Sequence, residues 1–330
     1  MIGSIQFKNF KVLRNCVLPL SRFTLIVGPN GSGKSTVFQA MLANLALDKI
    51  ALANVIPATL GQRPELLVEV RFNSPDGNLM LDWASNISNG THGIRKELRN
   101  TREMSTALWQ ARVYSLEAHR ISDPVQLKTK MELESDGFGL AVVLDRLRDE
   151  HPERFEAVNE ELGKWIPEFD RILFDTLDSP TGGRRAIALR TRSGHKIKAA
   201  DISHGTLIAL AILTIAYLPS PPPIVGFEEP DRGLHPRLLR DVRDALYRLA
   251  YPDQFGEKRE PVQVIATTHS PYLLDLFRDH PEEIVIAQKL EDNVRFERLS
   301  DRADLDEILK DAHLGDVWYS GILGGVPDRQ

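Results

Sequence analysis

An apolar run that leads into a glycine-rich loop and then a helix-forming stretch constrains this chain most. The run is Phe23–Val27, and it is followed directly by GPNGSGKS at residues 28–35. This is the G-x-x-x-x-G-K-[ST] phosphate loop in the strand–loop–helix context that the motif requires. Its glycines let the backbone wrap closely around phosphates, and the start of the next helix favours an anion. The sequence therefore predicts that the chain binds a nucleoside triphosphate.

The residue types within the loop each have a chemical reason. Lys34 can reach the β- and γ-phosphates, and the Ser35 hydroxyl can bind Mg²⁺. Backbone N–H groups of the loop point inward and form an anion-binding nest. The residues predicted to hold the nucleotide are Gly28, Pro29, Asn30, Gly31, Ser32, Gly33, Lys34, Ser35 and Thr36.

Composition excludes several classes of protein. The 330 residues permit one large α/β domain or two ordinary ones, and the net charge of −5 provides no global basic field for nucleic acid or membrane binding. Cys16 is the only cysteine, which excludes a disulfide framework and fits a reduced compartment. The longest apolar run, 208–218, is too short to span a bilayer, and the first ten residues lack a signal-peptide layout. We therefore expect a cytoplasmic protein without membrane association.

Hydrophobic periodicity predicts strands alternating with helices, which is typical of an α/β fold. Residues 91–110 are polar with a weak helical period, and 123–178 are mainly helical without sustained heptads. Two hairpins are expected, one joining 65–72 to 79–84 across Ser74-Pro75-Asp76-Gly77 and one over 185–198 around Ser193-Gly194. The other expected strands are 4–10, 23–27, 112–116, 224–227, 262–267 and 284–288. The other expected helices are 35–56, 204–218, 236–250 and a short one after Pro271.

A pair of acidic residues, Glu228 and Glu229, ends the apolar strand 224–227. An isolated Glu-Glu pair is more often a solvated surface. At the end of a buried strand, however, an uncompensated carboxylate is costly, and a divalent cation and a polarised water would remove that cost. Glu228 is then placed to hold Mg²⁺ through water, and Glu229 to orient or deprotonate an attacking water.

Two further motifs are ambiguous in isolation. His269 follows the predicted strand 262–267, and a lone histidine in a loop is more often structural. If that strand lies beside 224–227, His269 can hydrogen-bond the γ-phosphate and the attacking water. Ser203 begins a predicted helix, and taken alone it is an N-cap.

The four motifs GPNGSGKS, ISHGT, FEEPDRGLHP and TTHSP, in this order, resemble those of ABC-type ATPase heads. The resemblance is to the non-transporter branch, the RecF-like, OLD-like and SMC-like bacterial ATPases, and covers nearly the whole chain. It implies a P-loop NTPase fold with a mixed central sheet, an antiparallel β layer and an inserted helical subdomain. The head would divide into a Walker A lobe (1–115), the inserted subdomain (116–200), a signature, Walker B and switch-histidine lobe (201–290) and a tail (291–330).

The resemblance also implies a mechanism with ATP and Mg²⁺. Glu228 would be the Walker B acid, Glu229 the catalytic glutamate and His269 the switch histidine, with Lys34 at the phosphates. Ser203 and Gly205 match the signature loop, which caps the ATP of a second chain, so the working unit would be a homodimer around two ATP molecules.

This chain also departs from the family pattern. In the signature, the departures are Ile202, His204 and Thr206. Glu228 stands in place of the commoner Asp, and His235 stands at the position of the D-loop aspartate. No Q-loop glutamine is assigned, and 116–120 is the candidate segment for that loop.

Two roles for such an ATPase remain open. In the first, it is a switch subunit for a separate effector in a phage-defence or toxin–antitoxin-like system. The apolar tail 314–326 would then be a docking surface, although it could equally be a strap on its own core. In the second, it is a RecF-like DNA-binding repair protein, for which the support is two basic clusters that solvated surfaces would explain equally well. These clusters are Arg95, Lys96, Arg99 and Arg102, and Arg184, Arg185, Arg190, Arg192, Lys196 and Lys198.

Two enzyme classes are not expected. Residues 270–330 are too few for an acidic nuclease domain, so we do not expect the chain itself to be a nuclease. A small-molecule kinase would share only the phosphate loop, without the signature and histidine motifs.

Overall fold

The computed structural model describes residues 1–45, 65–72, 79–88, 91–98, 110–127, 132–177, 183–290, 293–311 and 313–324. Its contacts divide the chain into two compact units. Unit 1 comprises 1–113, 222–226 and 262–330, and unit 2 comprises 114–221 and 227–261. The division into a Walker A lobe, an inserted subdomain, a signature lobe and a tail, expected from the sequence, remains a prediction.

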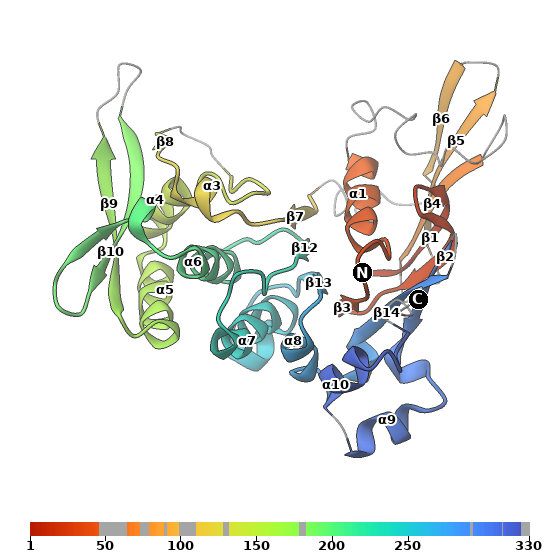
Figure 1. Ribbon diagram of the computed structural model, residues 1–330. Coiled ribbons are helices and arrows are strands. Elements are labelled where there is room, and N and C mark those ends of the chain that lie inside the picture. The colour runs from red at the N-terminus through yellow and green to blue at the C-terminus, as the bar shows by residue number, and fades with distance from the viewer. Residues whose placement is uncertain are drawn as a thin grey trace. The chain divides into compact units, whose positions relative to one another are not determined.

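A mixed six-stranded sheet contains the phosphate-loop strand (Figure 1). Its order is β15 (Asn293–Arg298), β14 (Ile284–Leu290), β3 (Phe23–Val27), β13 (Gln263–Thr268), β12 (Ile224–Glu228) and β7 (Arg112–Tyr114). Every residue of β3 is buried, and β13 and β14 both run parallel to it. A strand buried on both faces reads as a continuous apolar run, which is why β3 was recognisable. The expectation that 262–267 lies beside 224–227 is confirmed by the strand order.

A second, antiparallel sheet of five strands also belongs to unit 1. Its order is β2 (Leu13–Pro19), β1 (Ile2–Phe10), β4 (Glu65–Phe72), β5 (Leu79–Ser88) and β6 (Thr91–Leu98). The predicted hairpin of β4 and β5 is confirmed, while its turn lies outside the described residues. The weak helical expectation for 91–110 is wrong over 91–98, because pairing with β5 overrides a weak local preference.

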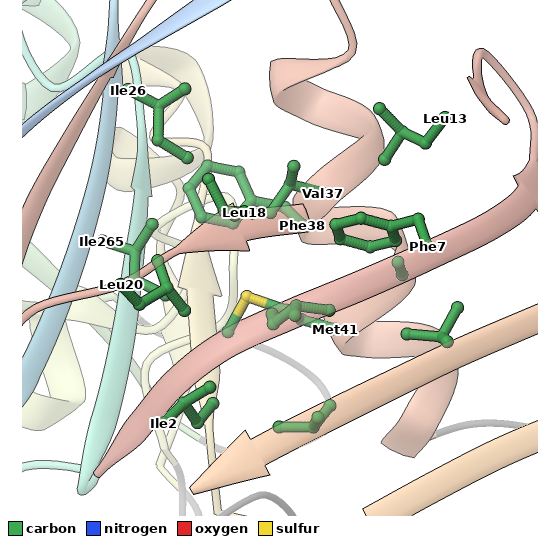
Figure 2. Packing of buried hydrophobic residues seen from close by; sticks show 14 of the residues in the cluster. Ile2, Phe7, Leu13, Leu18, Leu20, Ile26, Val37, Phe38, Met41 and Ile265 are labelled. Atoms are coloured by element: carbon green, nitrogen blue, oxygen red, sulfur yellow. The ribbon is translucent and has the colours of Figure 1, made fainter. Parts of the chain in front are cut away.

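The core of unit 1 lies under the first helix. Helix α1 (Lys34–Leu45) starts within the phosphate loop, and the remainder of the predicted helix 35–56 lies outside the described residues. Figure 2 shows Val37, Phe38 and Met41 of α1 in one cluster with side chains from β1, β2, β3 and β13. This cluster seats the phosphate-loop helix on the sheet.

The tail of the chain is partly a strap. Helices α8 (Pro271–Asp275) and α10 (Leu314–Tyr319) pack together, and Gly315 N donates a hydrogen bond to Asp275 Oδ1 at 2.9 Å. Leu314 and Leu323 are fully buried, whereas Tyr319 and Ile322 are 74% and 60% exposed. One side of the tail therefore packs on its own unit and the other faces solvent. Between β15 and α10 lies the short helix α9 (Leu305–Asp311).

Unit 2 is built from helices and a hairpin. Helices α4 (Leu140–Glu150) and α5 (Pro152–Trp165) pack on β9 (Phe169–Leu177) and β10 (Arg184–Thr191), as Figure 1 shows. The predicted hairpin over 185–198 is confirmed as β10 with β11 (Lys196–Lys198). The remaining helices and strand are α3 (Ala118–Ser122), β8 (Val125–Gln126), α6 (His204–Ala216) and α7 (Leu239–Ala250).

Residues 116–120, the candidate Q-loop, were expected at the end of a strand. Instead, they run into helix α3, which begins at Ala118. Short 3₁₀ turns connect several elements: Ala199–Asp201, Pro236–Leu238, Pro252–Phe255, Pro281–Glu283 and Leu299–Asp301. Among the described residues, none of the helices has the length and apolar character needed to cross a bilayer.

Candidate nucleotide site

The first and third glycines of the phosphate loop are required by close packing. A Cβ on Gly28 would lie 2.4 Å from the carbonyl oxygen of Ala287 in β14, so no other residue fits there. Gly33 has φ +83°, and a Cβ on it would lie 2.7 Å from Leu13 Cδ2. Both the conformation and the space at Gly33 therefore demand glycine. The turn between β1 and β2 thus holds the loop from one side and β14 from another.

Lys34 is held within the loop itself. Its side chain is buried, with 6% exposure, and Nζ donates to the carbonyl oxygens of Gly28 at 2.8 Å and Pro29 at 2.9 Å. A buried ammonium needs such acceptors. Phosphate oxygens are better acceptors than neutral carbonyls, because hydrogen bonds between charged groups are roughly twice as strong. The ammonium is therefore positioned to exchange loop carbonyls for phosphate.

The loop residues fit a Mg²⁺-bound triphosphate. The Ser32 hydroxyl is buried and has no hydrogen-bond partner in the part of the chain that the structure describes. The first N–H groups of α1 have no partner within the helix, and Ser35 is exposed in its first turn. Donors, a cation and an accessible hydroxyl thus gather at one helix start, which suits a phosphate with its metal ion.

His269 follows a strand that lies directly beside the phosphate-loop strand. The parallel register pairs Thr268 with Val27, so Gly28 and His269 leave the sheet at the same edge. Ser270 N donates to Thr268 Oγ1 at 2.9 Å, and Ser270 Oγ accepts from Leu273 N at 3.2 Å, capping α8. His269 is therefore held between a buried strand and a capped helix. Of the predicted site residues, the structure brings His269 and residues 28–36 together in unit 1.

Glu228 and Glu229 lie at the end of β12 and belong to unit 2. Glu228 is half-buried, and Glu229 has φ +48°, in the left-handed region that few residues other than glycine adopt. Arg232 N donates to Glu229 O at 2.9 Å and closes the turn. A side chain held in this conformation costs on the order of 1–2 kcal/mol, and such strain clusters at functional sites.

Ser203 and Gly205 lie at the start of α6 in unit 2. Ser203 Oγ accepts from Thr206 N at 3.2 Å and lies 2.8 Å from Thr206 Oγ1, so Thr206, a departure from the family pattern, orients the Ser203 hydroxyl. A Cβ on Gly205 would lie 2.8 Å from the carbonyl oxygen of Gly233. The signature segment thus packs on the turn after Glu229. Sequence reasoning missed Gly233, whose φ of +75° explains the glycine in DRGLHP.

Carboxylates within unit 2 form ion pairs with three of the six basic residues in the cluster of residues 184–198. Arg185 pairs with Asp145 at 2.8 Å, and Arg190 with Asp170 at 2.9 Å. The contact with Arg190 holds the pKa of Asp170 below its usual range. Lys196 pairs with Asp175, and Arg192 Nε donates to the Pro167 carbonyl at 2.6 Å. These ion pairs account for Arg185, Arg190 and Lys196 within unit 2 itself. The basic residues 95, 96, 99 and 102 have no described side chains.

Comparison with known proteins places the chain among P-loop ATPases. A family model described as "AAA ATPase domain" matches residues 1–103. Another, described as "AAA domain, putative AbiEii toxin, Type IV TA system", matches residues 120–275. The OLD nuclease of Thermus scotoductus is 49% identical over 41 residues. That match spans only 8% of the nuclease and 12% of this chain.

Solved structures of SMC heads share the fold. The SMC head bound to the C-terminal winged-helix domain of ScpA has a TM-score of 0.59 and 19% identity, over 90% of this chain and 96% of that one. The SMC head with a coiled coil and joint from Pyrococcus yayanosii has a TM-score of 0.51 and 13% identity, over 94% and 99%.

The phosphate loop and the mixed sheet define a P-loop NTPase of the ABC-head fold. The two family models both describe AAA-type ATPase domains, so the comparisons support an ATP-binding ATPase whose fold is that of the SMC heads. The resemblance of the four motifs to this group is thereby confirmed at the level of fold and class.

Proposed function

We propose that this chain binds and hydrolyses Mg-ATP, forms a head-to-tail homodimer around two ATP molecules, and switches a separate effector. The observation that carries the proposal is the register of Thr268 with Val27. Because of this register, the phosphate loop and His269 follow their strands at the same edge of one sheet. A histidine that is to contact the γ-phosphate needs this position. The strained backbone of Glu229 gives independent support for a catalytic role there.

Each residue has a role in this scheme. Lys34 binds the β- and γ-phosphates, and Ser35 and Glu228 hold Mg²⁺, Glu228 through water. Bound Mg²⁺ would neutralise phosphate charge. Glu229 orients and deprotonates the attacking water, and His269 donates a hydrogen bond to the γ-phosphate. Residues 28–33 and Thr36 complete the contacts with the phosphates.

Dimerisation would use the start of α6. Ser203 and His204 are exposed, and the first N–H groups of a 13-residue helix need acceptors. The γ-phosphate of an ATP bound to the partner chain would supply them, with Ser203 and Gly205 acting in trans. Binding energy for ATP then becomes binding energy for the dimer, and hydrolysis releases it.

The effector would be a separate protein in a phage-defence or toxin–antitoxin-like system. The family description that names a type IV toxin–antitoxin system supports this setting. The exposed side chains of Tyr319 and Ile322 offer a contact surface on the tail. We propose that the chain acts in the cytoplasm and is not itself a nuclease, the effector supplying any such activity.

The test is the mass of Glu229→Gln in solution with and without Mg-ATP. We expect a monomer that becomes a dimer only with Mg-ATP, because this variant should bind but not hydrolyse ATP. Adding Ser203→Arg should keep ATP binding and abolish the dimer. A mass that does not respond to ATP would contradict the sandwich. Hydrolysis stimulated by DNA, with a steep salt dependence, would instead support the RecF-like alternative.

A further inference from the structure

A glycine lies in the middle of a buried strand where its backbone does not need it. Gly226 is the third residue of β12, and glycine in a strand interior weakens the strand. Its φ is not positive, unlike that of Gly33. The reason for Gly226 must therefore be space rather than conformation.

That space is occupied by an aromatic ring from the phosphate-loop helix. A Cβ on Gly226 would lie 2.7 Å from Phe38 Cε1 and 3.0 Å from Phe38 Cδ1. It would also lie 3.1 Å from Val113 Cγ2. All three residues belong to unit 1, and Phe38 is 2% exposed. The ring therefore fills the notch left by the missing side chain (Phe38 is labelled in Figure 2).

Phe38 is also tied to the catalytic loop by helix geometry. It follows Lys34 by four residues in α1, so the two side chains project from the same face of the helix, one turn apart. The depth at which the ring enters the notch thus sets how far the first turn of α1, with Lys34 and Ser35, lies from β12. Two residues further along β12 is Glu228.

We propose that Gly226 and Phe38 are positioning residues for the nucleotide and its metal ion. The contact of the Phe38 ring with Gly226 fixes the position of α1 against the sheet. The position of α1 in turn determines where Lys34 and Ser35 lie. This inference rests on the proposed roles of Lys34 at the phosphates and of Ser35 at Mg²⁺. A rigid ring in a close-packed core cannot absorb a new methyl group without moving, so the displacement would pass to the helix.

The test is a double-mutant cycle with Gly226→Ala and Phe38→Leu. The readout is the affinity for a fluorescent ATP analogue, measured in EDTA and across a Mg²⁺ titration. We expect Gly226→Ala to raise the Mg²⁺ concentration for half-maximal binding roughly tenfold or more, since displacements near 1 Å cost up to about 100-fold. Phe38→Leu in the same chain should restore most of it, because the smaller side chain leaves room for the methyl group.

The controls separate positioning from loss of fold. Gly163→Ala is a matched control, because a Cβ there meets only the Phe169 carbonyl oxygen at 3.4 Å. It should leave the Mg²⁺ titration unchanged. Phe38→Leu alone should also raise the Mg²⁺ concentration for half-maximal binding, since it leaves the notch partly empty. The double variant should therefore need less Mg²⁺ for half-maximal binding than either single variant.

Three results would overturn the proposal. They are unchanged Mg²⁺ dependence in a folded Gly226→Ala protein, unchanged dependence in Phe38→Leu, and strictly additive effects in the double variant. If Gly226→Ala does not fold, Phe38→Leu alone decides. Because the readout is binding, it does not depend on hydrolysis or dimerisation, and failure of the Glu229→Gln dimer test would remain a separate result.

Discussion

The side chain of Gln263 makes a reciprocal pair of hydrogen bonds with the backbone of Ile2. Gln263 Nε2 donates to Ile2 O at 2.7 Å, and Ile2 N donates to Gln263 Oε1 at 2.8 Å. The same Nε2 donates to Ser21 O at 2.9 Å. Gln263 begins β13, whereas Ile2 begins β1, so one buried amide joins the two sheets of unit 1.

Replacing that amide should destabilise unit 1. Gln263→Leu has similar volume but leaves backbone groups of Ile2 and Ser21 buried without partners, which costs about 2–4 kcal/mol. The loss of stability should appear as a lower midpoint urea concentration for unfolding. Gln254→Leu, at an exposed position, should change little. Equal stability of the two variants would show that the reciprocal pair contributes nothing.

Lys34→Ala should weaken nucleotide binding. Loss of a charge-assisted hydrogen bond costs about 1.5–3 kcal/mol, which corresponds to roughly 10–150-fold in the dissociation constant. Titration of a fluorescent ATP analogue measures it. Lys258→Ala removes the charge of an exposed lysine in unit 2 and should bind normally. Unchanged affinity in Lys34→Ala would refute the assignment of the phosphate loop.

Glu229→Gly should abolish ATP hydrolysis without lowering the stability of the fold. Glycine adopts the observed φ of +48° without strain, which gains about 1–2 kcal/mol against an entropic cost of about 0.5–1 kcal/mol. We expect a variant at least as stable as the parent that no longer hydrolyses ATP. Thermal unfolding and phosphate release measure the two effects. Glu260→Gly, without the positive φ, should lose stability, and an equal loss in Glu229→Gly would argue against strain at this site.

A half-buried carboxylate in unit 2, that of Glu257, should contribute to the dependence of stability on acid pH. Burial raises the pKa of Glu257, but hydrogen bonds and charge from Arg248 and Arg259 more than offset this, so its pKa lies below the ordinary 4.5. Arg259 Nε lies 2.6 Å from Glu257 Oε2. The stabilisation is therefore complete above pH 4.5 and is lost as the pH falls through the lower pKa of the folded state.

Glu257→Gln should cost about 1.5–3 kcal/mol at pH 7, because it leaves two half-buried guanidinium groups without their counter-charge. Its denaturation midpoint should also fall less steeply than the parent's below pH 4.5. Glu260→Gln, a neighbouring exposed change, should retain the acid dependence of the parent. A parent-like acid limb in Glu257→Gln would place the responsible carboxylate elsewhere.

Much of the fold followed from local pattern. β3 is apolar apart from Thr24, β13 contains the apolar run Val264–Ala266, and the predicted β4–β5 and β10–β11 hairpins matched the observed pairing. β6 was missed because its sequence THGIRKEL is largely polar, although Asn89-Gly90 between it and β5 in the sequence is a hairpin turn signal. β15 was missed although Val294 and Phe296 alternate with polar residues and only two residues separate it from β14. Both strands pair with the strand directly before them, so the signal that would have found them lies in the short connections.

The site was less completely predictable than the fold. The phosphate loop is specified by its own residues, and so was found. The reasons for Gly205 and Gly226 lie in groups that approach from other segments, namely the Gly233 carbonyl oxygen and the Phe38 ring. No spacing within the chain encodes such an approach. The ion pairs of Arg185 and Arg190 are likewise invisible in a count of charges, and so the hairpin looked like a basic surface.

The order of strands in the central sheet has a consequence for the nascent chain. β3 leaves the ribosome early, but both of its neighbours, β13 and β14, are encoded more than 230 residues later. At about 5–20 residues per second, its edges would wait on the order of 10–50 s for their partners. During that interval a largely apolar strand lacks both of the strands that flank it in the finished sheet. The ATPase fold of this chain can therefore close only after most of the polypeptide has been made, and a chaperone that shields β3 should raise the yield of active protein.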